Sequence, residues 1–250
     1  MIRISHLSAG YGEKTVLQDL TFSIEPGSVT TLVGPNGCGK TTLLRALTGQ
    51  LSQMAGEISL CGKELSSYNR KELARTVALL PQTRNTPDLT VEALVEHGRY
   101  PHLGFSRRLS EKDRQIVSRA MDQTDVAHLA HLPLGELSGG QQQRAYIAMA
   151  LAQDAQIIAL DEPTAHLDLQ HQFELLELVR RLQAAGKTVV LVLHDLDHAL
   201  RYSDRLVLLQ QGRLIQWGTP RALLDSGALE QVFQVRIRET EGGYLFSTGG

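Results

Sequence analysis

The chain lacks several features that would place it in a specialised class. Among its 250 residues, Cys38 and Cys61 are the two cysteines, too few for a disulfide scaffold or a cysteine-based metal site, and this fits a reducing cytosol. Apolar runs such as residues 189–193 have strand length, far below the ~18 residues that span a bilayer. The residues after Met1 turn polar at once, so no signal peptide is expected.

Positive charge is not in excess either. The chain carries 25 Lys and Arg residues against 27 Asp and Glu residues, without a long basic run, and this disfavours nucleic acid as the main partner. Hydrophobic residues make up 42% of the chain, which is enough for a sizeable core in one large domain or two small ones.

Three regions differ in their patterns. Residues 1–33 alternate like β-strands, with a turn expected at residues 8–12. Residues 90–132 have helical patterns and no strand pattern, as expected of a helical subdomain inserted into an α/β core. After a predicted hairpin over residues 205–217, we expect a helical segment, and then a short strand with a frayed end over residues 242–250.

The strongest motif is a glycine-rich stretch between an apolar run at 30–33 and a helix-like run at 43–47. Its G-x-x-x-x-G-K-[ST] spacing is typical of loops whose backbone N–H groups, together with the next helix, bind phosphate. Lys40 adds a positive charge at the terminal phosphates, and the Thr41 hydroxyl can ligate Mg²⁺. The alternative is a plain glycine turn before a helix. The candidate residues for binding a nucleoside triphosphate are Gly34, Pro35, Asn36, Gly37, Cys38, Gly39, Lys40, Thr41 and Thr42.

A second candidate anion site lies at the start of a long helix predicted to run through Leu151. Ser138 and Gln141 have the spacing of a capping box, and Gly139 and Gly140 leave backbone N–H groups bare at a positive helix end. The alternative is an ordinary helix cap, which the two glycines make less attractive.

Two adjacent acids end the buried-type strand predicted over residues 155–160. Acids in that place are costly unless they have a function: Asp161 can hold Mg²⁺ through water, and Glu162 can polarise a water that attacks phosphorus. His194 follows another such strand, four residues before His198. That spacing could imitate a metal pair, but no third ligand follows at a sensible distance.

Two further residues are ambiguous from the sequence. The ring of Tyr11, near the phosphate loop, could stack on a purine base, or Tyr11 could be a turn residue with a solvated hydroxyl. Gln82 follows a predicted strand, where α/β sheets place ligand groups, although a loop amide is usually just solvated.

Taken in order, these motifs resemble the ATP-binding subunit of an ABC transporter over nearly the whole chain. Tyr11 is similar to the adenine-stacking aromatic of the A-loop, residues 34–42 to Walker A, and Gln82 to the Q-loop glutamine. Residues 137–141 read LSGGQ, the signature of the family.

The second half of the chain continues this resemblance. Residues 157–162 are similar to Walker B, with Glu162 in the catalytic position, and His194 is similar to the switch histidine. Asp168 matches the D-loop aspartate, whereas Ala165 departs from the serine of many members, which puts one D-loop hydrogen bond in doubt.

The resemblance implies a fold and a site. The fold would be α/β, a RecA-like P-loop NTPase core with an N-terminal antiparallel β subdomain over 1–83 and 153–250, and an inserted helical subdomain over 84–152. Glu162, His194 and Gln82 would be catalytic, ATP and Mg²⁺ would be the cofactors, and the Mg²⁺ ligands would come from Thr41, Gln82 and Asp161.

The resemblance also implies partners. A second copy of the chain would complete each ATP site, with Ser138, Gly139, Gly140, Gln141 and Asp168 facing the nucleotide of the other copy. Membrane permease subunits would hold the pair at the cytoplasmic face of the membrane, with a substrate-binding protein as an indirect partner. Residues 98–102 and 164–172 are similar to segments of importers of ferric siderophores, haem or cobalamin.

Other functions compete with this interpretation. An ABC-type ATPase acting on DNA or ribosomes would usually carry tandem cassettes or long coiled coils, and neither is present. A simple P-loop kinase or GTPase would not carry LSGGQ. A non-catalytic ATP-binding module would not need Glu162 and His194, and an importer of another metal or an exporter stays open.

Overall fold

The computed structural model describes residues 1–82, 87–104, 108–165 and 167–248. The strands of the two larger sheets are β1 (Ile2–Tyr11), β2 (Lys14–Ile24), β3 (Val29–Val33), β4 (Gln53–Leu60), β5 (Lys63–Glu64), β6 (Val77–Leu80), β7 (Ile157–Asp161), β8 (Thr188–Val192), β9 (Arg205–Gln210) and β10 (Arg213–Gly218), and a hairpin of β11 (Val235–Thr240) and β12 (Gly243–Thr248) follows. The helices are α1 (Lys40–Leu47), α2 (Arg70–Thr76), α3 (Val91–His97), α4 (Glu111–Gln123), α5 (Gly139–Ala152), α6 (Leu169–Ala184), α7 (Leu196–Tyr202), α8 (Pro220–Asp225) and α9 (Ala228–Phe233).

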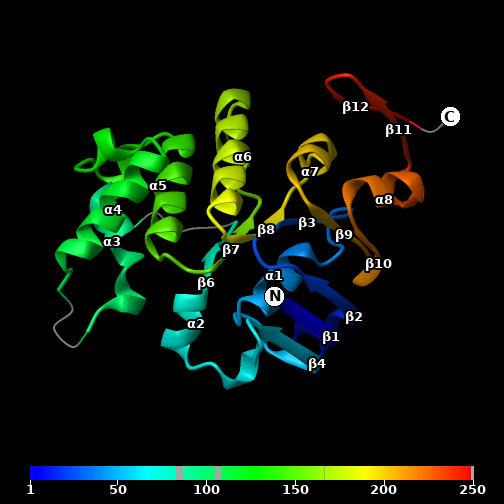
Figure 1. Ribbon diagram of the computed structural model, residues 1–250, viewed down its shortest axis with the longest axis horizontal. Coiled ribbons are helices and arrows are strands. Elements are labelled where there is room, and N and C mark those ends of the chain that lie inside the picture. Colours follow the sequence, from blue (N-terminus) through cyan, green and yellow to red (C-terminus); the bar gives the residue numbers. More distant parts are fainter. Residues whose placement is uncertain (83–86, 105–107, 166, 249–250) are drawn as a thin grey trace.

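A six-stranded sheet forms the centre of the molecule, in the order β10-β9-β3-β8-β7-β6 (Figure 1). Every residue of β3, β7 and β8 is buried, which explains why these strands are continuous apolar runs rather than alternating ones. The pairs β9–β3, β3–β8, β8–β7 and β7–β6 are parallel, and β10 pairs antiparallel at one edge. The carboxyl ends of four helix-connected strands therefore meet at one edge of the sheet, as expected of an α/β core.

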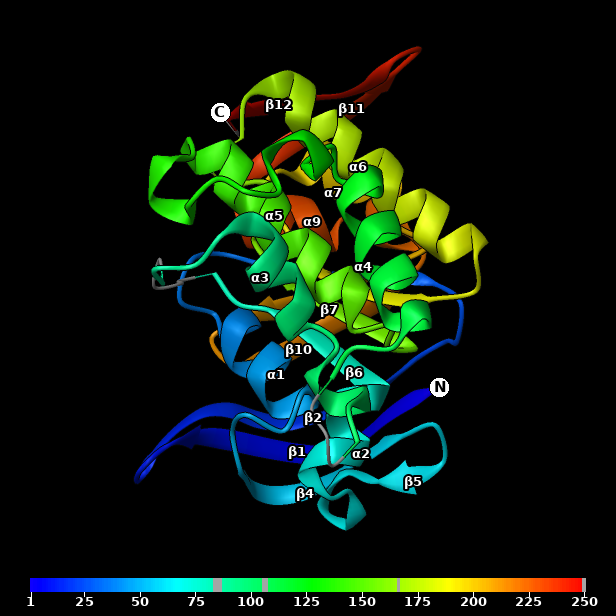
Figure 2. The ribbon, with the colours of Figure 1, turned by 90° about the vertical axis from the view of Figure 1, so that its left-hand side faces the viewer.

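The N-terminal residues form the antiparallel sheet β2-β1-β4-β5, which lies at one end of the molecule (Figure 2). The turn expected at residues 8–12 is wrong, because β1 continues to Tyr11 and the chain turns at Gly12. The register of β1 against β2 shifts three times, and His6 and Asp19 have positive φ. These irregularities break the alternation of period two from which the strand was predicted.

Helices α3, α4 and α5 pack on one another as a separate layer, which lies away from the antiparallel sheet in Figure 2. Each of these helices begins after a residue type that is favoured at the N-cap. Thr90, Ser110 and Ser138 each accept a hydrogen bond from the backbone N–H three residues later. Ser110 and Ser138 form complete capping boxes, which satisfy two N–H groups at the helix start. The helical pattern of residues 90–132 is confirmed for the described part of this region.

The segment from Gly98 to Leu103 joins this layer to the core. A Cβ on Gly98 would lie 2.3 Å from the Met149 carbonyl oxygen, so only glycine allows this approach. His102 Nε2 is 2.8 Å from the Gln153 carbonyl oxygen, and Gln153 Nε2 donates to the Val77 carbonyl at 2.8 Å and to the Ala74 carbonyl. The carboxyl end of α5 is therefore tied to α2 and β6.

A buried ion pair reinforces the same joint. Both Arg99 Nε and Nη2 lie 2.9 Å from Asp113 Oδ1, and Arg99 Nη1 donates to the Ala152 carbonyl at 2.8 Å. Ser110 donates through its hydroxyl and its backbone N–H to the other oxygen of Asp113. The hydrogen bonds from Ser110 and then those from Arg99 lower the pKa of Asp113 to about 2.

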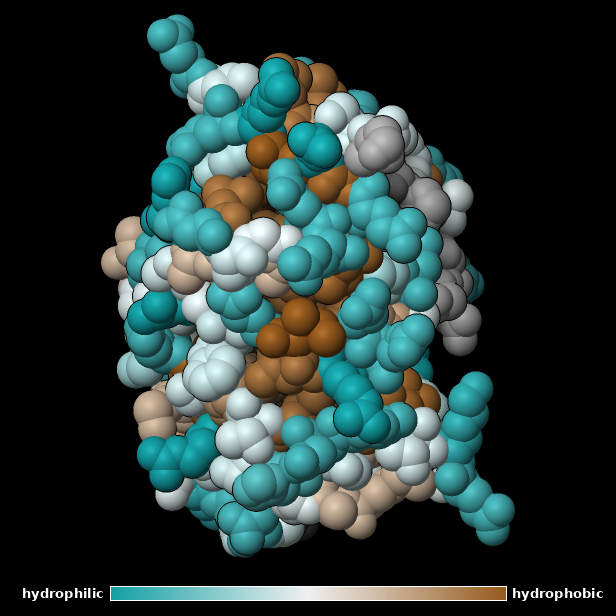
Figure 3. Space-filling model, turned by 90° about the vertical axis from the view of Figure 1, so that its right-hand side faces the viewer, coloured by the Kyte–Doolittle hydropathy of each residue, from teal (hydrophilic) through white to brown (hydrophobic). Residues whose placement is uncertain are grey.

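The C-terminal residues form α8, α9 and a β-hairpin that lies at the upper right of Figure 1. The predicted helical segment and the strand β12 are confirmed, but β11 was not expected. The face of the molecule on this side carries a band of apolar side chains with hydrophilic ones on both flanks (Figure 3). Among the described residues, no helix has both the length and the apolar character that crossing a bilayer requires.

We expect Asp113→Asn to lower the free energy of unfolding by about 1–2 kcal/mol at neutral pH, a value that allows for solvent screening. Because the pKa of Asp113 is depressed in the folded state, this loss should be complete above about pH 4 and should shrink as the pH falls toward 2. Urea unfolding at a series of pH values measures it. Asp122→Asn, at an exposed position of the same helix, is the control, and an equal, pH-independent loss in both variants would contradict the assignment.

Candidate active site

The phosphate-binding loop predicted from the sequence lies between β3 and α1, as expected. Gly34, Gly37 and Gly39 have φ values of 148°, 75° and 108°, in the region that favours glycine. A Cβ on Gly34 would lie 2.1 Å from the Leu209 carbonyl oxygen, so this glycine also allows the loop to pass close to β9. The strand, loop and helix thus occur in the order that phosphate capture requires.

Lys40 is buried inside this loop. Its Nζ donates to the Gly34 carbonyl at 2.7 Å and to the Pro35 carbonyl at 3.2 Å. These bonds hold a full positive charge inside the loop, where an anion bound by the loop N–H groups would also interact with Lys40. Cys38 is buried in the same loop, and its burial raises the pKa of the thiol, so Cys38 is a neutral, packed side chain.

Two oxygen ligands suited to a hard cation lie next to the loop. Thr41 Oγ1 donates to Asp161 Oδ1 at 3.1 Å, and Asp161 is only 2% exposed. Burial raises the pKa of Asp161, although the hydrogen bond from Thr41 and the positive charges of Arg45 and Lys40 oppose this. A buried carboxylate beside a hydroxyl fits Mg²⁺, which prefers oxygen ligands and would compensate the desolvation of the acid.

Glu162 lies at the centre of the candidate site. Its Oε2 accepts a hydrogen bond from Gln82 Nε2 at 2.5 Å, and its Oε1 lies 2.5 Å from His194 Nε2. These three residues directly follow β6, β7 and β8 or come within two residues of their ends, so the parallel register of the sheet brings them together. Glu162 has a φ of +51°, a backbone conformation that residues other than glycine seldom adopt and that often marks a functional site.

The loop and the carboxylate cluster open into one pocket of about 360 Å³. Its lining residues come from five segments of the chain and are Val16, Asn36, Gly37, Gly39, Lys40, Thr41, Thr42, Gln82, Glu162 and His194. Sequence reasoning missed Val16, because a single apolar residue in a strand carries no signal of a ligand. Half of the His194 side chain is exposed, against 14% of Glu162, so the histidine faces the open side of the pocket.

Tyr11 does not line this pocket. It ends β1 instead of lying in a turn, is 45% exposed, and its hydroxyl accepts a hydrogen bond from Arg45 Nη1 at 3.2 Å. The hydroxyl is thus engaged by α1 while the ring stays accessible, a placement compatible with stacking on a base.

The glycine-flanked start of α5 also lies outside the pocket. Ser138 and Gly139 are exposed, and nothing lies within 4 Å of a Cβ built on Gly139. Gln141 Oε1 accepts from the Ser138 N–H at 2.9 Å, which completes the capping box. This helix end is therefore solvent-accessible and does not line the pocket that contains Lys40 of the same chain.

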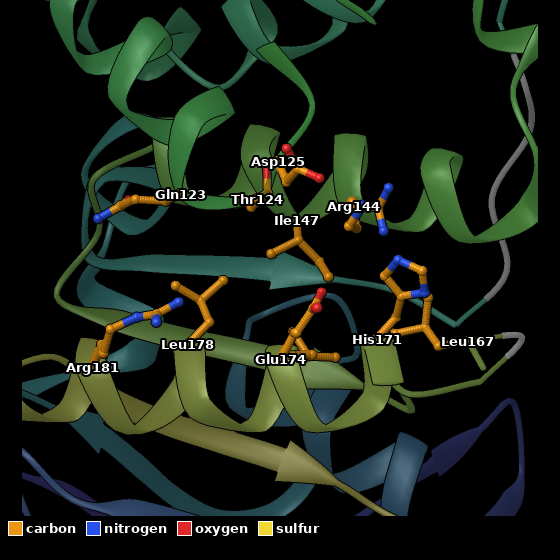
Figure 4. A pocket seen from close by; sticks show the side chains of 11 residues that line it. Gln123, Thr124, Asp125, Arg144, Ile147, Leu167, His171, Glu174, Leu178 and Arg181 are labelled. Atoms are coloured by element: carbon orange, nitrogen blue, oxygen red, sulfur yellow. The ribbon is translucent and has the colours of Figure 1, made fainter. Parts of the chain in front are cut away.

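Asp168 begins the neighbouring helix α6. It accepts from the His171 N–H at 3.0 Å and lies 2.7 Å from His171 Nδ1, and the backbone bond is the main reason why its pKa is lowered. Figure 4 shows Arg144 of α5 on the opposite side of a pocket from His171 and Glu174 of α6. The starts of α5 and α6 are thus neighbouring, exposed and polar.

Three further histidines, His198, His128 and His131, lie outside the pocket. His198 is 4% exposed and packs edge-to-face on Phe173, with ring centroids 5.3 Å apart. His128 and His131 are exposed. Within the described ranges, no group of three or more His, Cys, Asp or Glu side chains could hold a metal ion.

Comparison with known proteins decides the family. The family model described as "ABC transporter" matches residues 17–165. The chain belongs to the ABC transporter family. As an ABC-type ATPase it binds and hydrolyses ATP, and its α/β fold is the expected P-loop NTPase fold.

Three relatives illustrate the similarity. The chain is 44% identical to the iron(3+)-hydroxamate import ATP-binding protein FhuC of Bacillus subtilis (strain 168), over 92% of this chain and 86% of the relative. It is 43% identical to the ferric enterobactin transport ATP-binding protein FepC of Escherichia coli (strain K12), over 94% and 88%. A bacterial ABC transporter cassette solved as a dimer superposes with a TM-score of 0.80 at 28% identity, over 88% of this chain and 99% of the cassette.

The arrangement around Glu162 yields a kinetic prediction. Glu162→Gln keeps the size of the side chain but removes the carboxylate that could accept a proton from water. We expect ATP hydrolysis to slow by roughly 10²–10⁴-fold, the contribution of general-base assistance, while ATP binding survives. Steady-state phosphate release and nucleotide-binding titrations measure the two effects. Near-normal turnover in this variant would reject Glu162 as the base.

Proposed function

We propose that this ABC ATPase is the ATP-hydrolysing subunit of an importer for an iron–siderophore chelate. The relatives at 44% and 43% identity are named for import of iron(3+)-hydroxamate and transport of ferric enterobactin. Since each match covers more than nine-tenths of this chain, the likeness extends beyond the nucleotide motifs that all members share. Haem and cobalamin belong to the same proposed class of bulky metal chelates.

The observation that carries the catalytic part of the proposal is the position of the Glu162 carboxylate between Gln82 and His194, in the pocket that also contains Lys40. Lys40 and the loop N–H groups would hold the β- and γ-phosphates. Thr41 and Asp161, with Gln82, would hold Mg²⁺, which supplies neutralisation of charge on the phosphates when bound. Glu162 would orient and deprotonate the attacking water, and His194 would keep that carboxylate in place.

The second part of the proposal is a homodimer. Ser138 is exposed, Gly140 is partly buried, and both lie outside the pocket of their own chain, but the end of α5 is suited to bind the γ-phosphate held by a second copy. Asp168 would lie at the same contact. The dimeric form of the 28%-identical cassette supports this pairing. Loss of the γ-phosphate would remove the bridging charge and loosen the dimer.

The third part of the proposal concerns organisation and location. Residues 1–83 and 153–250 would act as the catalytic body, and residues 84–152 as the part that moves against it. Permease subunits would contact the helical part and hold the protein at the cytoplasmic face of the membrane, while a separate binding protein delivers the chelate. Nucleic acid would not be a partner.

Cargo can be tested by isolation of the membrane partner with this chain as bait. The complex, reconstituted in vesicles with ATP, should take up a ferric hydroxamate or ferric catecholate siderophore. If the complex takes up haem or cobalamin but no siderophore, the cargo is a different member of the proposed class of bulky metal chelates. Copurification with ribosomes or DNA, and with no membrane protein, would contradict the transport role.

The homodimer yields a separate prediction. In a Glu162→Gln background, which retains ATP, we expect light scattering to show a doubling of mass on addition of ATP. Ser138→Arg should abolish this dimer, because a bulky cation would occupy the place of the γ-phosphate contact. Ser110→Arg is the matched control, since it removes the same type of capping box from α4 at a similar cost of about 1 kcal/mol. A nucleotide-dependent dimer in the Ser138→Arg variant would count against the shared site.

A further inference from the structure

The placement of His194 depends on a very short helix. His194 comes two residues before α7, which has seven residues. A helix of two turns is not stable by itself, so its position is set by the elements that contact it. Asp195 caps α7 by accepting from the His198 N–H at 3.1 Å, and this cap joins His194 directly to the first turn. Any displacement of that turn therefore moves the histidine relative to Glu162.

One side of α7 packs on α6. His198 is buried there and packs on Phe173 of α6, and Ala199 and Leu200 belong to the main apolar core. These contacts and the packing of Leu196 hold the helix against the body of the protein, and further support for its first turn comes through Asp197.

The C-terminal hairpin supplies that support. The backbone N–H of Tyr244 donates to Asp197 Oδ1 at 3.0 Å, and Figure 1 shows the hairpin above α7. Gly243 has a φ of +157°, and a Cβ at this residue would lie 2.7 Å from the same Asp197 oxygen. Glycine thus allows the hairpin to come close enough for the bond. The other oxygen of Asp197 lies 3.4 Å from Arg201 Nη1, within α7 itself.

The hairpin is itself fixed to the body of the protein. The Ile237 N–H donates to Glu230 Oε1 of α9 at 2.7 Å, and Arg221 of α8 pairs with Glu239 at 2.9 Å. The side chains of Ile237 and Tyr244 pack against the main apolar core. A hairpin anchored in this way can hold Asp197 in one place and is not a loose terminal segment.

We propose that Asp197 is a positioning residue for hydrolysis, and that the bond from the Tyr244 N–H to Asp197 holds the first turn of α7 so that His194 contacts Glu162. The inference rests on the proposed roles of His194 and Glu162. Asp197 lies outside the ATP pocket, so its effect should fall on kcat and not on the KM for ATP. The contact between Asp197 and the Tyr244 N–H would then influence hydrolysis from a place far from the phosphate loop in sequence.

Two variants remove this support from opposite sides. Asp197→Ala deletes the acceptor, and Gly243→Ala places a methyl group against the Asp197 carboxylate, so that the carboxylate or the hairpin must shift. We expect each to lower kcat by about 3- to 10-fold, a fraction of the effect of losing a catalytic group outright, with the KM for ATP changed less than about twofold. Asp197→Asn keeps an amide oxygen for the Tyr244 N–H but loses the ion pair with Arg201. It should restore most of the rate.

Glu239→Gln is the matched control. It weakens a different anchor of the same hairpin, at the exposed pair with Arg221, and should leave kcat within about twofold of the starting protein. Thermal unfolding of all four variants shows whether any of them has lost its fold. An equal fall in kcat for Glu239→Gln and Asp197→Ala would overturn the inference, since the effect would then reflect general loosening of the C-terminus.

A double-mutant cycle with His194→Ala completes the test. If Asp197 acts through His194, Asp197→Ala should cause no further fall in kcat once the histidine is removed. Additive losses would overturn the inference and leave the role of His194 intact. A His194→Ala variant with normal hydrolysis would instead contradict the proposed function. Normal kcat in both Asp197→Ala and Gly243→Ala, with a slow His194→Ala variant, would reject only the positioning role.

Discussion

The parallel pairing of β6, β7, β8 and β3 is the constraint on which the site depends. Each of these strands ends at the same edge of the sheet, and each is followed by a residue or loop of the site. A carboxylate such as Glu162 is costly to bury alone, but the neighbouring strand ends supply an amide and an imidazole on either side of it. The same register places Asp161 against Thr41, so one backbone arrangement satisfies both acids.

Much of the fold and of the candidate site could be predicted from the sequence, because the informative signals are local. The order of strand, glycine-rich loop and helix, the capping box at Ser138 and the buried strands follow from spacing, capping residues and apolar runs, and the structure confirms them. The resemblance to a known family implied catalytic roles for Glu162, Gln82 and His194, but their mutual contacts were not predicted, since they join residues far apart in the chain. The bulges of β1 and the strand β11 were missed, because an irregular register and a half-exposed hairpin leave no regular pattern of apolar residues.

The polar groups of the candidate site lie in two places, the pocket that contains Lys40 and the start of α5. Groups in the pocket with Lys40 already have partners within the same chain, as the bonds of Lys40, Thr41 and Glu162 demonstrate. At the start of α5 the capping box uses the N–H groups of Ser138 and Gln141, and Ser138 and Gly139 are exposed to solvent. This difference is the physical basis for the proposal that a second copy of the chain completes the site.

The attachment of α5 at its carboxyl end has a mechanical consequence. Gln153 is bonded to α2, β6 and His102, whereas Ser138 at the other end is exposed. The 15 steps from Ser138 to Gln153 correspond to a lever of roughly 22 Å, at 1.5 Å per residue. A rotation of about 10° with Gln153 as the pivot would carry the tip through roughly 4 Å, more than the length of a hydrogen bond. A small swing about Gln153 would therefore be sufficient to make or break a contact at the exposed start of α5, where Ser138 lies.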